Sequence, residues 1–208
     1  MNKIVFLVSS NGGNVKFFDL AIKYNLVSKS DIYVIADRAC GAVEYAKTNN
    51  IESMIINYSR DHDSELRKAL LDINPDVVVS TWNKIIDEDT VKKYFGKIIN
   101  VHYSLLPAFG GMIGVKPIEK ALDLGCKYIG PTCHVVDEGV DTGRILSQSV
   151  FSTGNISFDE AVGEMFRRGC ICLLEGINQV SKEPVTKNYD DKLLNQFNSE
   201  FWSELSVL

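Results

Sequence analysis

Apolar and polar positions alternate along this chain in two different rhythms. Short apolar runs bounded by turn residues are typical of buried strands, and they occupy residues 4–8, 32–36, 54–56, 77–80, 98–101, 128–136 and 145–150. Between them, apolar residues recur at helical spacing, which predicts helices over residues 15–24, 41–49, 64–74, 87–95, 115–124 and 158–180.

The order of these elements predicts an α/β fold. Strands that alternate with helices favour a mostly parallel, twisted sheet flanked by helices. Residues 4–8 and 77–79 are continuously apolar, as expected for strands covered on both faces. The pattern changes after about Gly125, where two strands follow each other around the turn-rich residues 137–143. We therefore expect an antiparallel strand pair in the C-terminal half.

The last part of the chain has a pattern of its own. Apolar and aromatic residues lie at helical spacing among polar ones, at Leu193, Leu194, Phe197, Phe201, Trp202 and Leu205. We expect a terminal helix packed on the body of the protein or on a partner chain. The predicted organisation is a domain over residues 1–184 and a C-terminal helical tail over residues 185–208.

Composition limits the class of protein. A chain of 208 residues with 45% hydrophobic and 24% charged residues is typical of one globular domain. Area scaling predicts that about 70% of the unfolded surface is buried, so the core requires no disulfide or structural metal. The apolar runs are too short to cross a bilayer, so no membrane partner is expected. The net charge of −5 without a basic run argues against nucleic acid.

The five cysteines form no CxxC pair and no metal-ligand spacing. An odd number of cysteines, together with an apolar start too short for a secretion signal, predicts a reduced, cytoplasmic protein.

Residues 9–14, Ser-Ser-Asn-Gly-Gly-Asn, follow the first predicted strand and precede the first predicted helix. In a doubly wound sheet this turn lies at the carboxyl edge, where ligands bind. Its glycines allow close backbone approach, and the helix N-terminus offers free N–H groups to an anion. The alternative is a plain strand-to-helix turn in which Asn and Gly are turn and cap residues.

Asn100 and His102 lie near the end of the fifth predicted strand. The period of a strand places both side chains on the same side. An amide donor beside an imidazole suits a reaction that builds an oxyanion and moves a proton near neutral pH. The alternative is a hydrogen-bonded core pair.

A third group comprises Thr132 and His134 on a strand and Asp141 in a glycine-flanked loop. A carboxylate at such a place can orient a histidine or accept a proton through water. The alternative is an Asx-type turn around Asp141.

In this order the three groups resemble the folate-dependent formyltransferases. Residues 100–107, Asn-Val-His-Tyr-Ser-Leu-Leu-Pro, resemble the family's Asn-Ile-His-x-Ser-Leu-Leu-Pro signature. Residues 132–143 resemble its second signature, a Ser/Thr-x-His strand followed by a loop with the catalytic Asp. Residues 9–14 resemble the phosphate-binding turn of the purine-pathway members. The resemblance runs from about residue 1 to residue 180 and implies a Rossmann-like formyltransferase fold.

The resemblance also implies the activity. The co-substrate would be 10-formyltetrahydrofolate, with no metal and no covalent nucleophile. A primary amine would attack the formyl carbon, Asn100 and a protonated His102 would stabilise the oxyanion, and Asp141 would hold the imidazolium and relay a proton.

The same resemblance assigns the binding residues. Substrate phosphate would be bound by Asn11, Gly12, Gly13 and Asn14. Folate would be bound by Trp82, Asn83, Lys84, Ile85, Ile86, Ile98, Val136, Asp137, Glu138 and Val140. Thr132 and His134 would support the catalytic residues from behind.

Four positions depart from the family pattern. Lys84 stands where the family carries Arg, and Tyr103 stands where it carries Pro. Arg168 and Gly169 replace a Glu and a His in an ungapped alignment of the long helix. An Arg at 168 favours an additional anionic group, so Arg168 is an expected substrate contact.

The implied acceptor is glycinamide ribonucleotide of purine biosynthesis. The departures leave open a second acceptor class, an amino-sugar nucleotide or another phosphorylated amine. A further alternative is an inactive folate- or nucleotide-binding homologue. The expected partners are small molecules, and the expected state is a monomer or homodimer.

Overall fold

The computed structural model describes residues 1–186 and 197–207. Its main sheet has seven strands in the order β3-β2-β1-β4-β5-β7-β8. These strands are β1 (Lys3–Val8), β2 (Asp31–Ala36), β3 (Glu52–Ile55), β4 (Val77–Ser80), β5 (Ile98–His102), β7 (Thr132–Val135) and β8 (Ile145–Gln148). The pairings from β3 to β5 are parallel, and β7 pairs antiparallel with both β5 and β8. The predicted fold class is confirmed.

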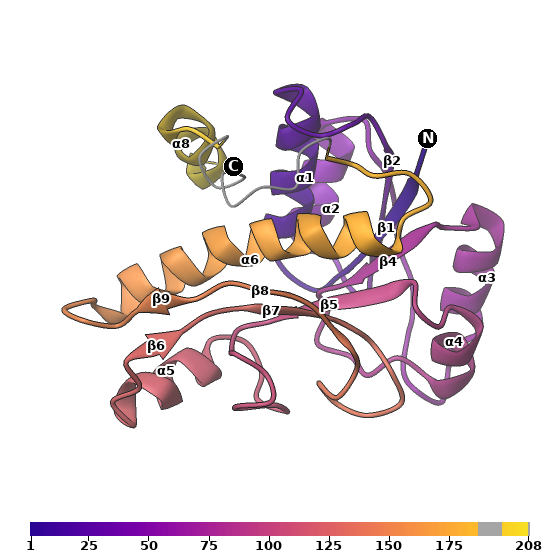
Figure 1. The fold of residues 1–208 in the computed structure, drawn as a ribbon. Helices are drawn as coiled ribbons and strands as arrows, with labels where there is room; N and C mark the ends of the chain where they lie inside the picture. Colours follow the sequence, from indigo (N-terminus) through magenta and orange to yellow (C-terminus); the bar gives the residue numbers. More distant parts are fainter. Residues whose placement is uncertain (187–196, 208) are drawn as a thin grey trace.

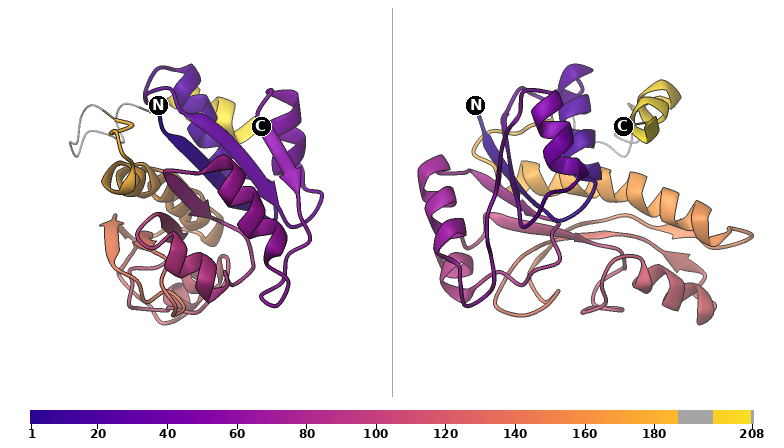
Figure 2. Two further views of the ribbon diagram at one scale, coloured as in Figure 1. Left: turned by 90° about the vertical axis from the view of Figure 1, so that its right-hand side faces the viewer. Right: turned by 180° about the vertical axis from the view of Figure 1, so that it is seen from behind.

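Helices cover both faces of this sheet (Figure 1). One face carries α1 (Gly13–Lys23), α2 (Gly41–Thr48) and the long α6 (Phe158–Val180). The other carries α3 (Ser64–Ile73) and α4 (Glu88–Lys93). Seen from the side and from behind, the helices form two layers with the sheet between them (Figure 2).

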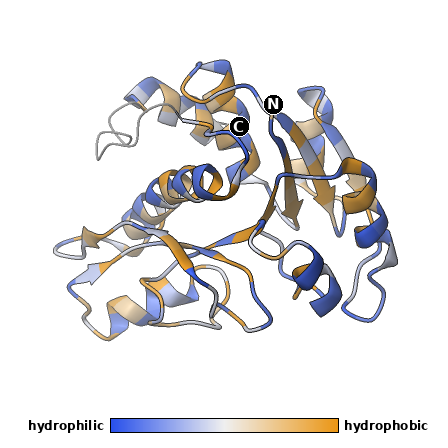
Figure 3. Ribbon diagram, turned by 45° about the vertical axis from the view of Figure 1, so that its right-hand side comes forward, coloured by the Kyte–Doolittle hydropathy of each residue, from blue (hydrophilic) through white to orange (hydrophobic). Residues whose placement is uncertain are grey.

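Strand β1 shows why this arrangement follows from the sequence. Its side chains alternate between the faces, so Ile4, Phe6 and Val8 join the core under α1, while Val5 and Leu7 join the core under α3. All five are almost completely buried. The hydropathy colouring shows mostly hydrophobic strands inside helices of mixed character (Figure 3).

One predicted strand, residues 128–136, is divided in the structure. Gly130 and Pro131 separate β6 (Tyr128–Ile129) from β7, and β6 pairs with β9 (Phe151–Ser152) in a small second sheet. The prediction of one continuous strand is therefore wrong, because Pro has no N–H for the ladder. The last predicted strand, residues 145–150, is shorter in the structure and ends at Gln148.

The small sheet covers a third apolar cluster. This cluster includes Ile118 and Ala121 of α5 (Lys116–Asp123), together with Phe151 and Met165. Helix α6 begins beside this cluster with a capping box, in which the Ser157 hydroxyl accepts from the Glu160 N–H and the Glu160 carboxylate accepts from the Ser157 N–H. Helix α6 therefore ties the C-terminal strands to the parallel half.

Helix α8 (Ser199–Val207) packs against α1, as Figures 1 and 2 show. Phe201 is completely buried, and its ring meets Phe17 of α1 edge to face with centroids 5.6 Å apart. Trp202 stacks on Phe17 at 5.8 Å. A terminal helix on the body of the protein is thus confirmed, whereas Leu193 and Leu194 lie outside the described residues. The domain boundary at residue 184 stays a prediction.

The strand order reverses between β1 and β4. Chain connections leave β1 toward β2 on one side and return to β4 on the other, which opens a crevice at the carboxyl ends of these two strands. Within residues 1–186 and 197–207, none of the helices has the length and hydropathy of a membrane-spanning segment.

Candidate active site

A cavity of about 600 Å³ opens at this carboxyl edge. Its walls come from the turn after β1, the loop after β4, the end of β5, and two loops further along the chain. All three predicted groups of functional residues contribute to the lining. The sheet topology therefore brings together segments that are far apart in the sequence.

Asn100 and His102 line the cavity from the last residues of β5. They are two residues apart on a strand, and each lies opposite a residue of β7, Asn100 opposite His134 and His102 opposite Thr132. The Asn100 amide donates one hydrogen bond to the Ser80 carbonyl at the end of β4, over 2.5 Å. This bond fixes the amide, and its second N–H has no hydrogen-bond acceptor among the residues that the structure describes.

Asp141 lies between two histidines. Its Oδ2 is 3.3 Å from His102 Nδ1, and its Oδ1 is 3.5 Å from His134 Nε2. The Gly111 N–H donates to Oδ2 over 2.8 Å. The Asp141 backbone has φ 56°, in the left-handed region that Asp tolerates better than most residues. This turn directs the carboxylate back toward β5 and β7.

The environment of Asp141 favours its ionised form. Burial by itself would raise the pKa of this carboxyl, but the contacts with His134, the Gly111 N–H and the charge of His102 outweigh it and lower the pKa below its ordinary value. Asp141 is therefore a carboxylate at neutral pH.

Both ring nitrogens of His102 face oxygen atoms. Nδ1 faces Asp141, and Nε2 is 3.1 Å from the Phe109 carbonyl. A carbonyl oxygen only accepts hydrogen bonds, so an imidazole protonated on both nitrogens satisfies both contacts. The geometry thus suits a cationic ring held beside a carboxylate.

The turn after β1 forms one end of the cavity. Gly12 and Gly13 line it together with Ser10 and Asn14. Gly12 has φ 69°, and the backbone then enters α1 at Gly13. A Cβ on Gly13 would lie 2.8 Å from Cε2 of Phe166, which also lines the cavity. Only glycine fits there without moving that ring.

Asn11 differs from its expected position, because it is not among the residues that line the cavity. Its side chain is directed to α2, where Oδ1 lies 2.9 Å from the position of a Cβ on Gly41. Gly12 has a left-handed backbone conformation, so the chain changes direction between Asn11 and Gly13. Gly13 therefore lines the cavity and Asn11 does not.

The loop after β4 forms another wall of the cavity. Trp82, Asn83, Lys84, Ile85 and Ile86 line the cavity as expected. The loop after β7 also lines the cavity, with Val136, Asp137, Glu138 and Val140. Lys84 Nζ is 4.0 Å from the buried carboxylate of Asp37.

Ile98 lies behind this wall and not in it. It is 1% exposed and packs in the same apolar cluster as Trp82. Ile98 lies on the same side of β5 as Asn100 and His102, but it is at the buried start of the strand, away from the carboxyl edge where the cavity opens. A contact of Ile98 with folate stays a prediction, and the cavity lining does not include this residue.

Arg168 is also outside the cavity. Its Nε lies 2.6 Å from Oε1 of Glu164 on the preceding turn of α6, and Nη1 donates to Ser149 Oγ and the Val150 carbonyl over 3.1 Å each. A guanidinium with these partners is anchored to the end of β8. The substrate contact of Arg168 stays a prediction, and its guanidinium lies outside the cavity lining.

Thr132 supports the site from β7. Its buried hydroxyl donates to the Ser104 carbonyl over 2.7 Å and accepts from the Leu106 N–H over 3.0 Å. These bonds hold the turn that directly follows β5.

Sequence reasoning missed one lining segment, the loop at Gly111, Met112, Ile113 and Gly114. The adjacent glycines 110 and 111 were the available signal for a backbone that approaches a ligand or a side chain. It also missed Ser80, Phe166 and the lining role of Tyr103. Among residues 1–186 and 197–207, no cluster of His, Cys, Asp and Glu has the arrangement of a metal site.

The structure is thus an α/β domain with a doubly wound sheet and with amide, imidazole and carboxylate groups at its carboxyl edge, residue types that group-transfer and hydrolytic chemistry can use. The model of the formyl transferase family matches residues 2–169. The chain belongs to this formyl transferase family.

Similar proteins carry related names. The chain is 32% identical over 160 residues to a chloroplastic phosphoribosylglycinamide formyltransferase of Arabidopsis thaliana, covering 71% of this chain and 54% of that protein. It is 34% identical over 110 residues to a formyltetrahydrofolate deformylase of Escherichia coli, covering 52% of this chain and 37% of that protein. The chain thus spans about half the length of the first curated relatives it matches.

A crystal structure of glycinamide ribonucleotide transformylase 1 from Symbiobacterium toebii superposes with a TM-score of 0.76 at 25% sequence identity. The match covers 85% of this chain and 86% of that one. The Rossmann-like formyltransferase fold expected from the sequence is therefore confirmed.

Proposed function

We propose that the protein transfers a formyl group from 10-formyltetrahydrofolate to the primary amine of glycinamide ribonucleotide, a step of purine biosynthesis. The observation that carries this proposal is the convergence of Asn100, His102 and Asp141 between two chemically different ends of one cavity. One end presents backbone N–H groups at the start of α1, and the other is an apolar loop wall.

The catalytic role of Asn100 follows from its fixed amide. When the amine attacks the formyl carbon, negative charge develops on the formyl oxygen. The Ser80 carbonyl holds Asn100 through one N–H, so the other N–H is oriented in advance for the oxyanion. Such a preorganised donor contributes roughly 10²–10³-fold in rate.

His102 and Asp141 act as a pair. An imidazolium beside the forming oxyanion would stabilise its charge, and the carboxylate 3.3 Å from Nδ1 orients the ring. The attacking amine must lose a proton, and the ionised Asp141 accepts it, directly or through water. When the tetrahedral intermediate collapses, the bond between the formyl carbon and the folate nitrogen breaks, and the proton passes to that nitrogen, which leaves as tetrahydrofolate. Neither a metal nor a covalent intermediate is required for this sequence of steps.

The acceptor binds at the glycine turn. Gly12, Gly13 and Asn14 supply N–H groups at the N-terminus of α1, where the helix dipole favours a phosphate. Asn11 would act only by shaping the turn.

The donor binds along the walls formed by the loops after β4 and β7. The apolar faces of Trp82, Ile85 and Ile86 suit the flat ring system of a folate, and Asp137, Glu138 and the backbone near Val140 offer polar groups to its edge. Lys84 belongs to this wall, with its Nζ 4.0 Å from Asp37, whose carboxylate is paired with Arg38 at 2.8 Å.

One assay tests the proposal. Purified protein and 10-formyltetrahydrofolate are mixed with glycinamide ribonucleotide, with amino-sugar nucleotides, or with no amine, and formyl transfer and tetrahydrofolate release are both followed. Acceleration with glycinamide ribonucleotide supports the proposal. Transfer only to a sugar nucleotide supports the second acceptor class, and tetrahydrofolate release without an amine supports a deformylase. No turnover and no transfer in any arm rejects a formyltransferase.

We further propose that residues 1–184 form the catalytic domain and residues 185–208 a C-terminal addition, in a monomer or homodimer. The five free thiols, three of them buried, favour a reducing compartment such as the cytoplasm.

A further inference from the structure

The loop from Thr81 to Asp87 joins β4 to α4 and forms the apolar wall of the cavity. Its first residues are tied to β1. The Thr81 N–H and hydroxyl both donate to the Leu7 carbonyl, over 2.9 and 3.0 Å, and the Asn83 N–H donates to Ser9 Oγ over 3.1 Å. The start of the loop is therefore fixed by the sheet.

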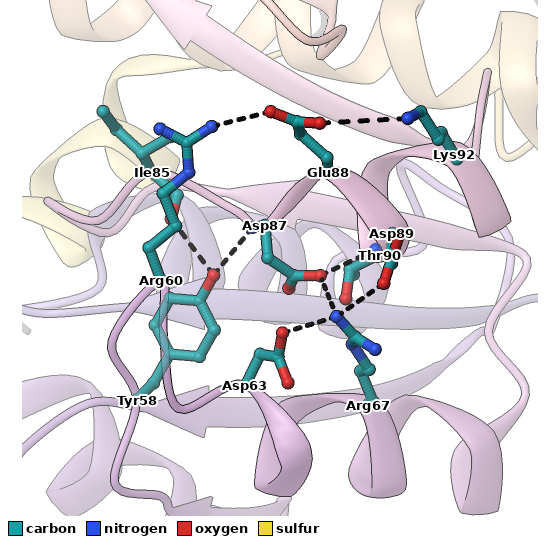
Figure 4. A network of polar contacts seen from close by, with 10 residues as sticks. All are labelled: Tyr58, Arg60, Asp63, Arg67, Ile85, Asp87, Glu88, Asp89, Thr90 and Lys92. Atoms are coloured by element: carbon teal, nitrogen blue, oxygen red, sulfur yellow. Dashed lines mark hydrogen bonds and ion pairs between the residues drawn. The ribbon is translucent and has the colours of Figure 1, made fainter.

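The end of the loop is tied to α4 and α3. Asp87 caps α4 by accepting from the Thr90 N–H over 2.9 Å, and its carboxylate pairs with Arg67 of α3 over 2.9 Å. Arg67 also pairs with Asp63 and Asp89 (Figure 4). These contacts hold the entrance to α4 but reach no residue between 82 and 86.

Tyr58 makes the contacts with the middle of the loop. It lies between β3 and α3, and its ring stacks on Trp82 with centroids 4.7 Å apart. Its hydroxyl donates to the Ile85 carbonyl over 3.0 Å and accepts from the Asp87 N–H over 2.8 Å (Figure 4). One side chain from a distant part of the chain thus touches the loop at three points.

The Tyr58 hydroxyl is well suited to this double role. The residue is 3% exposed, and burial raises the pKa of Tyr58 to about 12. The neutral hydroxyl keeps the proton that it donates to Ile85. It also accepts from the Asp87 N–H, which is buried and would otherwise lose its partner.

We propose that Tyr58 is a positioning residue for the donor side of the cavity. By holding Trp82 through its ring and Ile85 and Asp87 through its hydroxyl, it keeps the apolar wall in its binding conformation before the ligand arrives. It does not reach the catalytic residues. This role rests on the proposed function, since it assigns to Tyr58 control of affinity for the folate.

The test is Tyr58→Phe, which keeps the ring on Trp82 and removes both hydrogen bonds. Tyr94→Phe is the matched control, because Tyr94 is 6% exposed in the same apolar cluster and its hydroxyl has no hydrogen bond within the described part of the chain. In Tyr58→Phe, the KM for 10-formyltetrahydrofolate should rise roughly tenfold, the size expected for one or two hydrogen bonds. The kcat and the KM for the acceptor should stay within about twofold of wild type.

A direct binding measurement separates this inference from the proposed function. The chain has two tryptophans, so Trp202→Phe leaves Trp82 as the only tryptophan signal. In this background, tetrahydrofolate is titrated while Trp82 fluorescence is followed, well below the unfolding temperature of each variant. The expected result is weaker binding in Tyr58→Phe and unchanged binding in Tyr94→Phe.

Each other outcome has a distinct meaning. Equal tetrahydrofolate affinity in the Tyr58→Phe and parent proteins overturns the positioning role while leaving the proposed function intact. Equal losses in Tyr58→Phe and Tyr94→Phe also overturn it, because the effect would be one of general core stability. A parent protein that binds no tetrahydrofolate contradicts the proposed function itself.

Discussion

At the scale of single residues, the site depends on side chains whose polar atoms are already directed by the protein. Asn100 is held by the Ser80 carbonyl, His102 by Asp141 and the Phe109 carbonyl, and Asp141 by the Gly111 N–H. Groups fixed in this way need no rearrangement when charge develops on a substrate. The chemistry should therefore be sensitive to changes that leave the fold intact.

His102→Ala and Asp141→Asn test this directly. Each should lower kcat by roughly 10²–10³-fold, since each removes or unpairs the positive charge beside the oxyanion. Formyl transfer at saturating substrates is the measurement, and circular dichroism checks the fold. His62→Ala is the matched control, because His62 lies on an exposed loop away from the cavity. Near-normal turnover in either site variant would disprove the proposed mechanism.

Gly13→Val should act on the acceptor and not on the folate. A Cβ at this position meets the Phe166 ring at 2.8 Å, so the larger side chain crowds the phosphate end of the cavity. We expect the KM for glycinamide ribonucleotide to rise at least about tenfold, with little change in the KM for the donor. Gly154→Ala, where the nearest atom is 3.6 Å away, is the control. An unchanged acceptor KM would mean that the turn is only structural.

At the scale of elements, two loops at the carboxyl edge of the sheet lead directly into helix N-termini, and these N-termini help to set the conformation of the loops. The loop after β1 ends at the N-terminus of α1, and the loop after β4 ends at the Asp87 cap of α4. A cap satisfies N–H groups that the helix leaves free, so it also fixes the direction in which the preceding loop arrives. The stability of α4 and the geometry of the cavity wall are therefore linked.

Asp87→Asn tests this link through pH. Burial would raise the pKa of Asp87, but the hydrogen bond from Thr90 and the paired Arg67 lower it below its ordinary value. A lowered folded-state pKa stabilises the protein above about pH 4, the unfolded value, and this contribution is lost as the pH falls through the folded value. Asn still accepts from the Thr90 N–H. The free energy of unfolding should therefore drop by about 1–3 kcal/mol at pH 7.

Urea unfolding at a series of pH values measures this effect. The difference between wild type and Asp87→Asn should shrink below about pH 4. Asp123→Asn, on the exposed side of α5, is the control and should show no such trend. A difference that is constant from pH 7 to pH 3 would argue against the charge as its source.

At the scale of the whole molecule, α8 near the C-terminus packs against α1 near the N-terminus. Its aromatic residues pack on α1, which also carries the glycine turn at its other end. Tyr24 donates to Glu204 over 2.6 Å and adds a polar contact at the edge of this cluster. The helix thus contributes to the main core from a part of the chain beyond the residues matched by the family.

Phe201→Ala should destabilise the entire protein and leave kcat unchanged at low temperature. Phe201 is completely buried against Phe17, Tyr24 and Phe197. Loss of such a ring costs about 3–5 kcal/mol, which corresponds to a fall in Tm of roughly 6–20 °C for a chain of this size. Calorimetry measures it, with the exposed Ser203→Ala as the control. An unchanged Tm would show that α8 is not part of the cooperative unit.

Local patterns predicted most of the elements. The runs at 4–8, 32–36 and 77–80 lie within β1, β2 and β4, because strands buried on both faces require continuous apolar residues. The turn residues around 137–143 likewise indicated the antiparallel pair of β7 and β8. The division between β6 and β7 was missed, since Gly130 and Pro131 were read as part of an apolar run.

The sequence by itself determined which residues have chemistry to offer: the pair on β5, the glycine turn and Asp141 all line the cavity. Only the tertiary structure decided how these residues are used. Asp141 sits between two histidines, Arg168 turns away to Glu164, and Tyr58 supports a loop far along the chain. The physical reason is the distance along the sequence over which each kind of interaction acts. Periodicity and turn chemistry act between neighbours in sequence, whereas hydrogen-bond partners and burial depend on segments brought together by the sheet order.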